Sequence, residues 1–577
     1  MAILDVASKH REDFLYRRYL MGKHAIELGQ QGFVDRRARD DRRGAGGRRE
    51  GQQERRRNGP APGQAGPGGG FGRARGVDKK YYDGIFDKAK RDPRGYIIPS
   101  DQADFPTAVK FVNALLESGI AVERAKADFE VAGKNYPKGS FVVRTAQAFR
   151  PHVMTMFEPQ DHPNDIPYPG GAPNPPYDAA GWTLAYQMGV AFDRVLDAFD
   201  GPFERVPGVT KPPAGRLRRR RRARPATSST TGSTTRSSPS TACSRPARRS
   251  YWLKATAAGG TFRRYDLGPA TPARRTSCGK RPRSSGLNVA AATAAPKGEA
   301  FALKPLAHRA VGHLRRLDGL GLDPLAPRAV RVPLRARLRA GARRGRPRIP
   351  VRRAHLRRRL RPPRPGRGPG RPGRRLRGIF QLPAPANVPD EYKNRIGRVT
   401  AEKTVPILRQ FVEAGGTILA LDSATVLAEH FKLPLANALV EKAQDGTETP
   451  LRSEKFYVPG SILRARVDPS HPLAHGLAET IDVFYDNTPA FDAPARCRAQ
   501  GRESRRLVRR RPAPRAAAGP GAKRYLRRSV QVAEAVVGKG KVFLFGPEIA
   551  FRGQPHGTFK LLFNGLYYGP AAPVELQ

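Results

Sequence analysis

The alternation of two kinds of sequence constrains this chain more than any other feature. Some stretches carry apolar residues at helical or strand spacing, with glycines and prolines at their boundaries. Others have neither spacing and consist mainly of Arg, Pro, Ala, Gly and Ser; these five blocks cover about 36–76, 212–249, 263–285, 306–377 and 494–528. Only the first kind can build a packed core. The full length of 577 residues suffices for roughly two to four domains.

The net charge of +56 is concentrated in these arginine-rich blocks. Between Lys304 and Gly378 there are about two dozen arginines, two aspartates and no lysine or glutamate, and arginine outnumbers lysine roughly three to one in the whole chain. Arg, Pro, Ala and Gly have GC-rich codons, so GC-rich coding DNA read in a wrong frame gives this composition. We hypothesise that most of the blocks are frame-shifted, with a low-complexity insertion as the alternative for 36–76. The charge is then not a functional feature.

A polyanion partner is the alternative interpretation of the charge. The run Arg218 to Arg222 and the runs around Arg352 to Arg375 would bind phosphate by charge alone. No RNP, KH, zinc-finger or helix-turn-helix feature accompanies them, and they lack interleaved aromatic residues for base stacking. An arginine-rich nucleic-acid-binding protein therefore stays the alternative, and no specific nucleic acid is expected.

Cysteines and terminal signals exclude several other classes. Cys243, Cys278 and Cys497 fit neither a disulfide framework nor a CxxC metal knuckle. No apolar run approaches the ~18 residues that span a bilayer, so no membrane span is expected. The first residues lack a basic region followed by an apolar one, so no signal peptide is predicted.

The periodic stretches before residue 207 predict α/β structure. Gly119 suits the end of a helix that Pro106 opens. The expected elements are a helix over 11–29 with Phe14, Met21, Ala25 and Leu28 on one face, a strand at 96–98, a helix from 106 with Val109, Val112 and Leu116 on one face, a strand from 120, a hairpin-like pair of 128–132 with 140–144, a loop over 159–180 and a helix over 181–200.

The periodic stretches after residue 398 repeat helix and strand. A helix carrying Val405, Leu408 and Val412 leads to a buried strand at 417–421, and a sharp turn at Asp422 and Ser423 opens a helix over 425–431. Another buried strand begins at 541, and a helix spans 559–568. Helices alternating with apolar strands predict a mostly parallel, doubly wound sheet.

Several of these stretches resemble one protein family. YIIPSDQADFPTAVKFVNALLESGIAVERA, YPKGSFVVRTAQAFRPHV, PYPGGAPNPPYDAAGWTLAYQMGV and FDRVLDAFDGPFERV resemble the region that follows the peptidase domain in large bacterial zinc carboxypeptidase-like proteins. VEKAQDGTETPLRSEKFYVPGSILRARVDPSHPLAHGL and GKGKVFLFGPEIAFRGQPHGTFKLLFNGLYYG resemble their C-terminal domain, which is similar to flavodoxin-like glutamine amidotransferases. The resemblance covers roughly 60% of the chain, in colinear order.

The resemblance implies a fold and a domain order. We expect an α/β fold, with a flavodoxin-like or amidotransferase-like parallel sheet at the C-terminus, a smaller α/β region before it, and long Arg/Pro-rich disordered segments. The expected divisions are a helical remnant at 1–35 that follows a missing peptidase domain, a disordered 36–76, an α/β accessory region at 77–206, a mostly non-native or disordered 207–377, and an amidotransferase-like domain at 378–572 that is interrupted at 494–528 and lacks the first strands that 306–377 should supply.

The resemblance also implies an activity for the parent protein. Family members are secreted or periplasmic hydrolases that remove residues from peptide C-termini, with zinc held by HxxE and a distant His and a later Glu as general base. The catalytic domain is expected upstream of Met1, so this chain is interpreted as a non-catalytic accessory region. The chain is expected to contact peptide substrate only through the missing domain. It is expected to carry no zinc of its own. Its oligomeric state stays unknown.

No residue is assigned as catalytic, cofactor-binding or metal-ligating, and the candidates that the sequence offers have simpler interpretations. His24 and Glu27 form an HxxE on a helix, with His152 as an imagined third ligand, and a surface pair is the favoured interpretation. Asp422 and Ser423 resemble a nucleophile elbow without its Cys, and His430 lies too far along the next helix to be assigned as the base, which favours an ordinary turn.

The remaining candidates also have simpler interpretations. His471 and His475 are four apart but sit in a loop with Pro472 and Gly476. Lys539 and Lys541 could contact phosphate, but a solvated turn is favoured, and Trp182 and Tyr186 could contact a ligand, but core packing is favoured. A small-molecule-binding α/β module is the third function class, and it would use the strand ends near Asp422 and Gly546.

Overall fold

We analysed a computed structural model of the chain. It describes residues 2–31, 91–159, 166–168, 170–175, 183–213, 217–218, 226–230, 249–257, 262–267, 289–292, 297–304, 308–311, 334–336, 353–356, 401–492, 496–499, 502–514, 521–527 and 529–577. The chain divides into two units. Unit 1 comprises Met1–Gln102, Val112–Met154 and Ala191–Thr210, and unit 2 comprises Ala103–Phe111, Thr155–Val190 and Lys211–Gln577.

Unit 1 is built on an antiparallel sheet. Its strands are β1 (Gly95–Ile98), β2 (Glu123–Ala125), β5 (Phe141–Arg144), β6 (Asp193–Val195) and β7 (Phe203–Arg205), in the order β6-β1-β5-β2-β7. Because β1 and β2 both run antiparallel to β5, they are parallel to each other, and α5 (Phe105–Glu117) joins them. This is a split βαβ arrangement. The prediction of a mostly parallel sheet is therefore wrong for this unit, because β5 lies between the two parallel strands.

The hairpin of unit 1 differs from the predicted one. β3 (Phe129–Val131) pairs with β4 (Lys134–Tyr136), whereas the sequence predicts pairing of 128–132 with 140–144. The turn is tighter because Ala132 (φ 51°) and Gly133 (φ 74°) both take the left-handed conformation, which suits two-residue hairpin turns. Phe129 stacks on Tyr136 with 5.2 Å between ring centroids, and both belong to the apolar core of this unit.

The N-terminal helices leave much of their apolar surface exposed. α1 (Ala2–Lys9) and α2 (Arg11–Gln31) include the predicted helix. The predicted apolar face is wrong in part, because Phe14 and Met21 are 49% and 73% exposed while Ala25 is buried. A Cβ on Gly29 would lie 2.6 Å from backbone atoms of Thr145 and Ala146, so the buried contact of α2 depends on small residues rather than on large ones.

The helix predicted over 181–200 is also wrong. α6 (Arg150–Phe157) precedes it, and α7 ends after one turn, at Leu184–Met188. Gly189 adopts φ 67° and terminates the helix, as left-handed glycines commonly do. Asp193–Val195 then forms β6. The predicted strand from 120 begins later, as β2.

Unit 2 contains a mixed sheet of twelve described strands. One part is parallel and pairs in the order β15-β14-β16-β17-β27, with β14 (His308–Val311), β15 (Leu334–Ala336), β16 (Arg353–Leu356), β17 (Thr417–Leu421) and β27 (Gly540–Phe545). The other part is antiparallel and continues through β26 (Val530–Val537), β25 (Arg502–Pro514), β21 (Ser461–Val467) and β22 (Thr480–Tyr485). The fold is therefore mixed α/β, as the sequence predicts at this coarse level.

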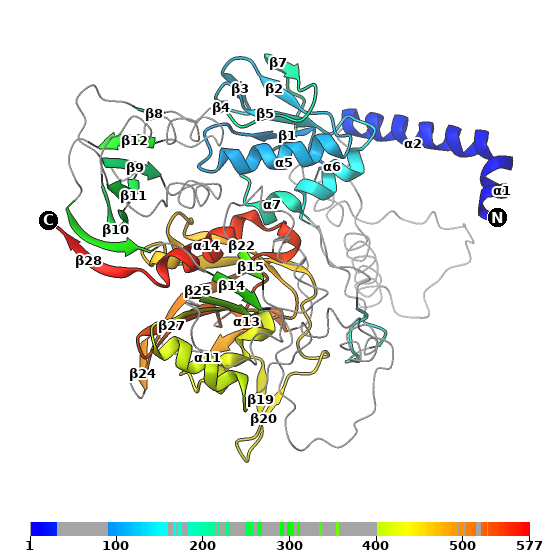
Figure 1. Cartoon of the computed structure of the whole chain (residues 1–577). Helices are drawn as coiled ribbons and strands as arrows, with labels where there is room; N and C mark the ends of the chain where they lie inside the picture. The colour runs from blue at the N-terminus through cyan, green and yellow to red at the C-terminus, as the bar shows by residue number, and fades with distance from the viewer. Residues whose placement is uncertain are drawn as a thin grey trace, which may run out of the picture. The chain divides into compact units, whose positions relative to one another are not determined.

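Strands β17 and β27 are buried on both faces. Leu419 and Phe543 belong to the apolar cluster that includes α14 (Phe559–Tyr568). Ile418 and Val542 belong to the cluster packed by α11 (Thr404–Glu413). Figure 1 shows α14 and α11 on opposite sides of the strands of this sheet. Two-sided burial explains why both strands read as continuous apolar runs in the sequence.

A second sheet of unit 2 is mostly antiparallel. Its order is β28-β13-β10-β11-β9-β12-β8. The C-terminal strand β28 (Ala572–Leu576) pairs with β13 (Gly298–Leu303), which pairs with β10 (Arg249–Ala257). The other strands are β8 (Leu217–Arg218), β9 (Ala226–Thr230), β11 (Phe262–Leu267) and β12 (Val289–Ala292).

Strands also lie inside four of the five arginine-rich blocks, where the sequence predicts no regular structure. They include β9, β11, β14 to β16, and the pair β24 (Arg496–Ala499) and β25. The expectation that the C-terminal domain lacks its native first strands stays a prediction, but these described residues do pair as strands. The physical reason is that ladder hydrogen bonds join backbone groups, so a segment without side-chain periodicity can still pair with a neighbouring strand. The block 36–76 lies outside the described residues.

Short elements complete the described parts. They are η7 (Asp422–Val426), α12 (Leu427–His430), β18 (Ala436–Asn437), β19 (Val440–Lys442), β20 (Glu448–Pro450), η8 (Pro472–Ala474), β23 (Phe491–Asp492), α13 (Ala522–Leu526), η9 (Phe551–Gly553) and η10 (His556–Thr558). Among the described helices, none has the length and apolar character required to cross a bilayer.

Candidate ligand pocket

A pocket of about 1000 Å³ lies in unit 2, at the edge of the sheet where β17 and β27 begin. Because these two strands are parallel neighbours, Gly415 before β17 and Lys541 in β27 lie at the same edge. Helix α14 follows β27 and returns along the sheet, so its last residue, Tyr568, reaches this edge as well. The remaining walls come from the η8 loop, from the segment before β28, and from β10 and β13.

His471 fixes one wall of the pocket. Its Nδ1 accepts a hydrogen bond from the backbone N–H of Leu473 at 3.1 Å, which caps η8. The ring proton must therefore sit on Nε2, which lies 2.7 Å from the Glu534 carboxylate. Both side chains are buried, at 8% and 3% exposure. The sequence places Glu534 in the middle of a strand that is apolar except for Gln531, and His471 gives its carboxylate a buried donor.

Glu534 also accepts a hydrogen bond from Tyr568, and its carboxylate lies close to the Lys541 ammonium. The Tyr568 hydroxyl donates to Oε1 at 3.2 Å, and the Lys541 ammonium lies 3.8 Å from the same oxygen. The Lys541 ammonium also lies 3.5 Å from the centroid of the Tyr568 ring, which is a close cation–π contact. His471, Glu534, Tyr568 and Lys541 thus form one polar cluster, which we call the Glu534 cluster. Three of its members line the pocket.

Lysine side chains give the pocket a positive character. Four lysines line it, whereas Asp468 contributes the one carboxylate among the described lining residues. Lys254 pairs with Glu299 at 2.7 Å outside the lining. Lys304 and Lys539 are exposed. An anion entering the pocket would meet four ammonium groups that come from distant parts of the chain.

The η8 loop is held by contacts that keep the wall in place. The Asn564 amide donates to the carbonyls of Leu473 and His475 at 2.8 and 3.0 Å, and the Lys560 ammonium donates to the Gly476 carbonyl at 2.8 Å. The His475 ring lies 5.8 Å from the ring of Trp252. The two histidines that the sequence places in a loop therefore lie in a wall that α14 anchors.

The sequence predicts part of this pocket and misses the rest. The sequence singles out His471 and His475, and it predicts a solvated turn for Lys539 and Lys541. Lys541 is half-buried and lies 3.8 Å from the Glu534 carboxylate, so that prediction is wrong for it. The sequence analysis does not include Glu534, although a single carboxylate within VQVAEAVV is a usable signal. No local pattern marks Lys254 and Lys304, because only the tertiary fold brings them here.

The turn at Asp422 lies at the opposite end of the same strands. Asp422 follows β17, is buried, and has φ 53°, a conformation that Asp tolerates better than most residues. The Thr425 hydroxyl donates to the Asp422 carbonyl at 2.6 Å. Leu421 is the N-cap of η7 and makes no side-chain cap bond. The Ser423 side chain lies outside what the structure describes, and His430 ends α12.

The HxxE pair does not fit a zinc site. On α2, His24 is exposed and Glu27 is half-buried, and His152 lies in α6. Within the described ranges, no group of three or more His, Cys, Asp or Glu side chains is arranged to hold a metal ion. His24 and Glu27, as the structure describes them, therefore do not fit a zinc site, and the resemblance places the family's zinc in the peptidase domain.

Several candidates lie outside the described residues or away from the pocket. Trp182, Cys243 and Cys278 are outside, as are most residues of the arginine runs. The side chain of Cys497, in β24, is also outside. Tyr186 is half-buried in α7.

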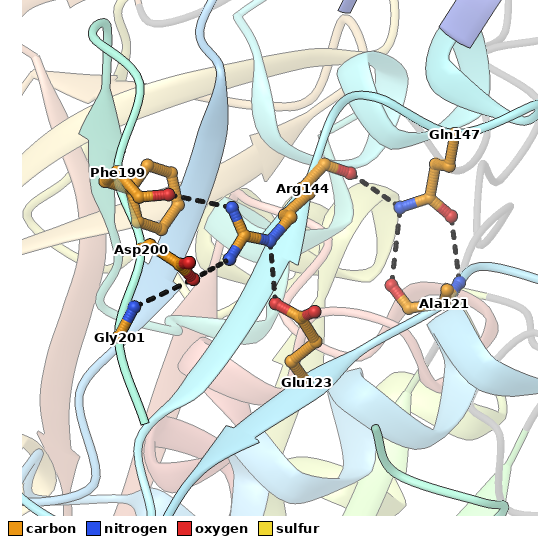
Figure 2. A network of polar contacts seen from close by, with 7 residues as sticks. All are labelled: Ala121, Glu123, Arg144, Gln147, Phe199, Asp200 and Gly201. Atoms are coloured by element: carbon orange, nitrogen blue, oxygen red, sulfur yellow. Dashed lines mark hydrogen bonds and ion pairs between the residues drawn. The ribbon is translucent and has the colours of Figure 1, made fainter. Parts of the chain in front are cut away.

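Unit 1 contains a separate polar cluster around Arg144. Its guanidinium donates to Glu123 at 2.9 Å, to the Phe199 carbonyl at 2.8 Å and to Asp200 at 3.0 Å (Figure 2). It also lies 5.1 Å from the Phe199 ring. The N–H of Gly201 and then Arg144 hold the pKa of Asp200 below its ordinary value. Since each partner is on another strand or on the loop before β7, the cluster joins parts of the sheet and has a structural role.

Comparisons with known proteins identify no family for this chain. No family model matches the chain, and no curated protein matches it. One solved structure to which part of the chain is similar is "Cytoplasmic Protein STM3548 from Salmonella typhimurium", with 16% identity and a TM-score of 0.17. The match covers 28% of this chain and 59% of that protein's chain, so it spans less than two thirds of that chain.

Proposed function

We propose that this chain is a non-catalytic, ligand-binding accessory region of a zinc metallocarboxypeptidase-like protein. The stretches quoted from 96–206 and from 440–569 support the family, because they are long and follow the family's order. The pocket beside the Glu534 cluster supports ligand binding. In this proposal the parent protein hydrolyses C-terminal residues of peptides, and this region binds a small molecule without hydrolysing it.

We propose further that the parallel part of the twelve-stranded sheet is flavodoxin-like, as in glutamine amidotransferases. Numbered along the chain, β14, β15, β16, β17 and β27 have the spatial order 2-1-3-4-5, which is the flavodoxin-like order. The packing of α11 and α14 against opposite faces supports the same assignment. The positive φ of Asp422 directly after β17 is compatible with an elbow whose reactive Cys has been replaced.

The observation that carries the proposal is the pocket itself. It is large enough for a small organic molecule, and the Glu534 cluster and the anchored η8 loop preorganise its walls. It lies at the amino ends of β17 and β27, whereas the sequence places a small-molecule site near Asp422 and Gly546, at their carboxyl ends. The proposed site therefore differs in place from the expected one.

A ligand screen that reports on the pocket tests this proposal. Trp252 is 5% exposed and lies next to His475, and Trp182 is the other tryptophan of the chain, so Trp182→Phe leaves one reporter beside the pocket. A library of small metabolites should contain members that shift both the unfolding temperature and the Trp252 fluorescence. Zinc and peptide substrates should release no C-terminal residue. Zinc-dependent release by the purified chain would contradict the non-catalytic assignment, and a library without any binder would contradict ligand binding.

A further inference from the structure

The cations of the pocket wall indicate a ligand class, and this inference rests on the proposed ligand-binding function. The four strongly basic side chains among the described lining residues are Lys254, Lys304, Lys539 and Lys541. None is an arginine, although arginine outnumbers lysine roughly three to one in the chain. We propose that the pocket binds a phosphate-bearing small molecule, with the phosphate held by these lysines.

The arrangement of the four lysines favours phosphate over carboxylate. Arginine presents a planar fork that matches either a carboxylate or a phosphate with two parallel hydrogen bonds, whereas lysine acts as a point charge with freely directed donors. A tetrahedral group with several charged oxygens can be approached by several ammonium groups from different directions. The lysines of this pocket come from β10, from the end of β13, and from the start of β27 with the turn before it, so they surround a position rather than form one fork.

The lysines differ in how far other groups already neutralise them. Lys541 faces Glu534 at 3.8 Å and Lys254 pairs with Glu299. Lys304 and Lys539 are exposed lining residues. Among the described lining residues, the negative charge comes from Asp468. We therefore assign the largest part of the attraction for an anion to Lys304 and Lys539, with Lys541 fixing the inner end of the site against Tyr568.

The size of the pocket indicates that the ligand is more than inorganic phosphate. A volume of about 1000 Å³ exceeds what one tetrahedral anion fills and falls at the upper end of the range for small-molecule sites. The rings of Phe301 and Tyr568 and several prolines also line it. The wall therefore offers apolar surface for an organic body next to the cationic part.

The four lysines are independent of the arginine-rich blocks. Each lies in a stretch with ordinary strand or turn sequence, at 254, 304, 539 and 541. The positive charge that this site uses is therefore separate from the charge that raises the net value to +56.

Binding by the full chain carrying Trp182→Phe tests the inference. The probes are ribose 5-phosphate and pyrophosphate, with ribose and succinate as the uncharged and carboxylate comparisons. The test variant carries Lys304→Gln and Lys539→Gln. The matched control carries Lys442→Gln and Lys455→Gln, which removes the same charge from lysines that pair with Glu448 and Glu441 in the β19–β20 region. Calorimetry gives the Kd, and Trp252 fluorescence reports whether binding occurs at the pocket.

We expect the phosphate probes to bind at the pocket, the test variant to raise their Kd at least about tenfold, and the control to leave it within about twofold. Raising the salt from about 0.05 M to about 0.5 M should weaken the binding, because rim lysines are screened. Equal binding of succinate and the phosphates, or binding of ribose that the lysine changes do not affect, would overturn the phosphate assignment and leave the ligand-binding function intact. If neither these probes nor the metabolite library bind, the proposed function itself is wrong.

Discussion

Removing the carboxylate of Glu534 is the most informative change in unit 2. Glu534 is 3% exposed, accepts from His471 at 2.7 Å and from Tyr568 at 3.2 Å, and faces Lys541 at 3.8 Å. Glu534→Ala removes the acceptor from all three groups. Breaking a buried charged network in this way costs about 3–5 kcal/mol, since the donors are left buried without that acceptor.

Glu534→Gln should cost much less. The amide oxygen can still accept from His471 Nε2–H, and the Tyr568 hydroxyl can rotate to accept from the amide N–H. The loss is then mainly the negative charge that faces Lys541, whose side chain is 20% exposed. We expect about 1–2 kcal/mol, so the two variants should differ by about 2–3 kcal/mol in the free energy of unfolding.

Urea unfolding followed by Trp252 fluorescence in the Trp182→Phe background measures this difference. Trp252 belongs to the same apolar cluster as α14, so the signal reports on unit 2 and avoids treating both units as one transition. Glu479→Ala, at an exposed position of unit 2, is the matched control and should stay within about 0.5 kcal/mol of the starting protein. The reasoning is refuted if Glu534→Ala costs less than about 1 kcal/mol, or if Glu534→Gln costs as much as Glu534→Ala.

Four further predictions address other parts of the chain. Gly540→Ala would place a Cβ 2.1 and 2.2 Å from two backbone carbonyl oxygens. In urea titrations this change should lower the free energy of unfolding by about 2–4 kcal/mol. The control Gly208→Ala, whose Cβ would meet nothing within 4 Å, should be neutral. Burial, and then the charge of a nearby lysine, lowers the pKa of His556 to about 4 from 6.5; its neutral form stabilises the fold above pH 6.5, and on the order of 3 kcal/mol is lost as the pH falls from 6.5 to about 4. A His556→Phe variant should lose that part of the pH dependence, and an unchanged profile would contradict the assignment. Arg144→Lys should raise the pKa of Asp200 by NMR titration only part of the way to its ordinary value, because the backbone N–H bond persists; no change would argue against the network in Figure 2. Translating the coding DNA of the arginine-rich blocks in all three frames should recover sequence that has helical or strand periodicity and contains Asp and Glu. If no frame does, the frame-shift hypothesis is wrong.

The sequence predicts best those elements whose own apolar residues show the spacing of a buried helix or strand. α14 begins and ends at the predicted residues, and β17 is the predicted strand, because each is either amphipathic at helical spacing or apolar throughout. The helix over 181–200 fails for an equally local reason, since Gly189 ends it after one turn.

The pocket could not be predicted from the sequence, because its residues are brought together by pairings of distant strands. Lys304 and Lys539 are separated by more than two hundred residues and become neighbours of one cavity through β13, β28 and β27. Strands β14 to β16 could not be predicted either. Their pairing depends on backbone groups, while their sequence shows only arginine and small residues.

The pairing of β28 with β13 has a consequence for synthesis of the chain. Strand β13 ends at Leu303, but its partner β28 does not begin until Ala572. The edge of β13 that pairs with β28 therefore remains without that partner while the ribosome synthesises some 270 further residues. During that interval an exposed strand edge invites pairing with other nascent chains. Slow translation or a shortage of chaperones should therefore reduce the yield of soluble protein more than the stability of the finished fold would suggest.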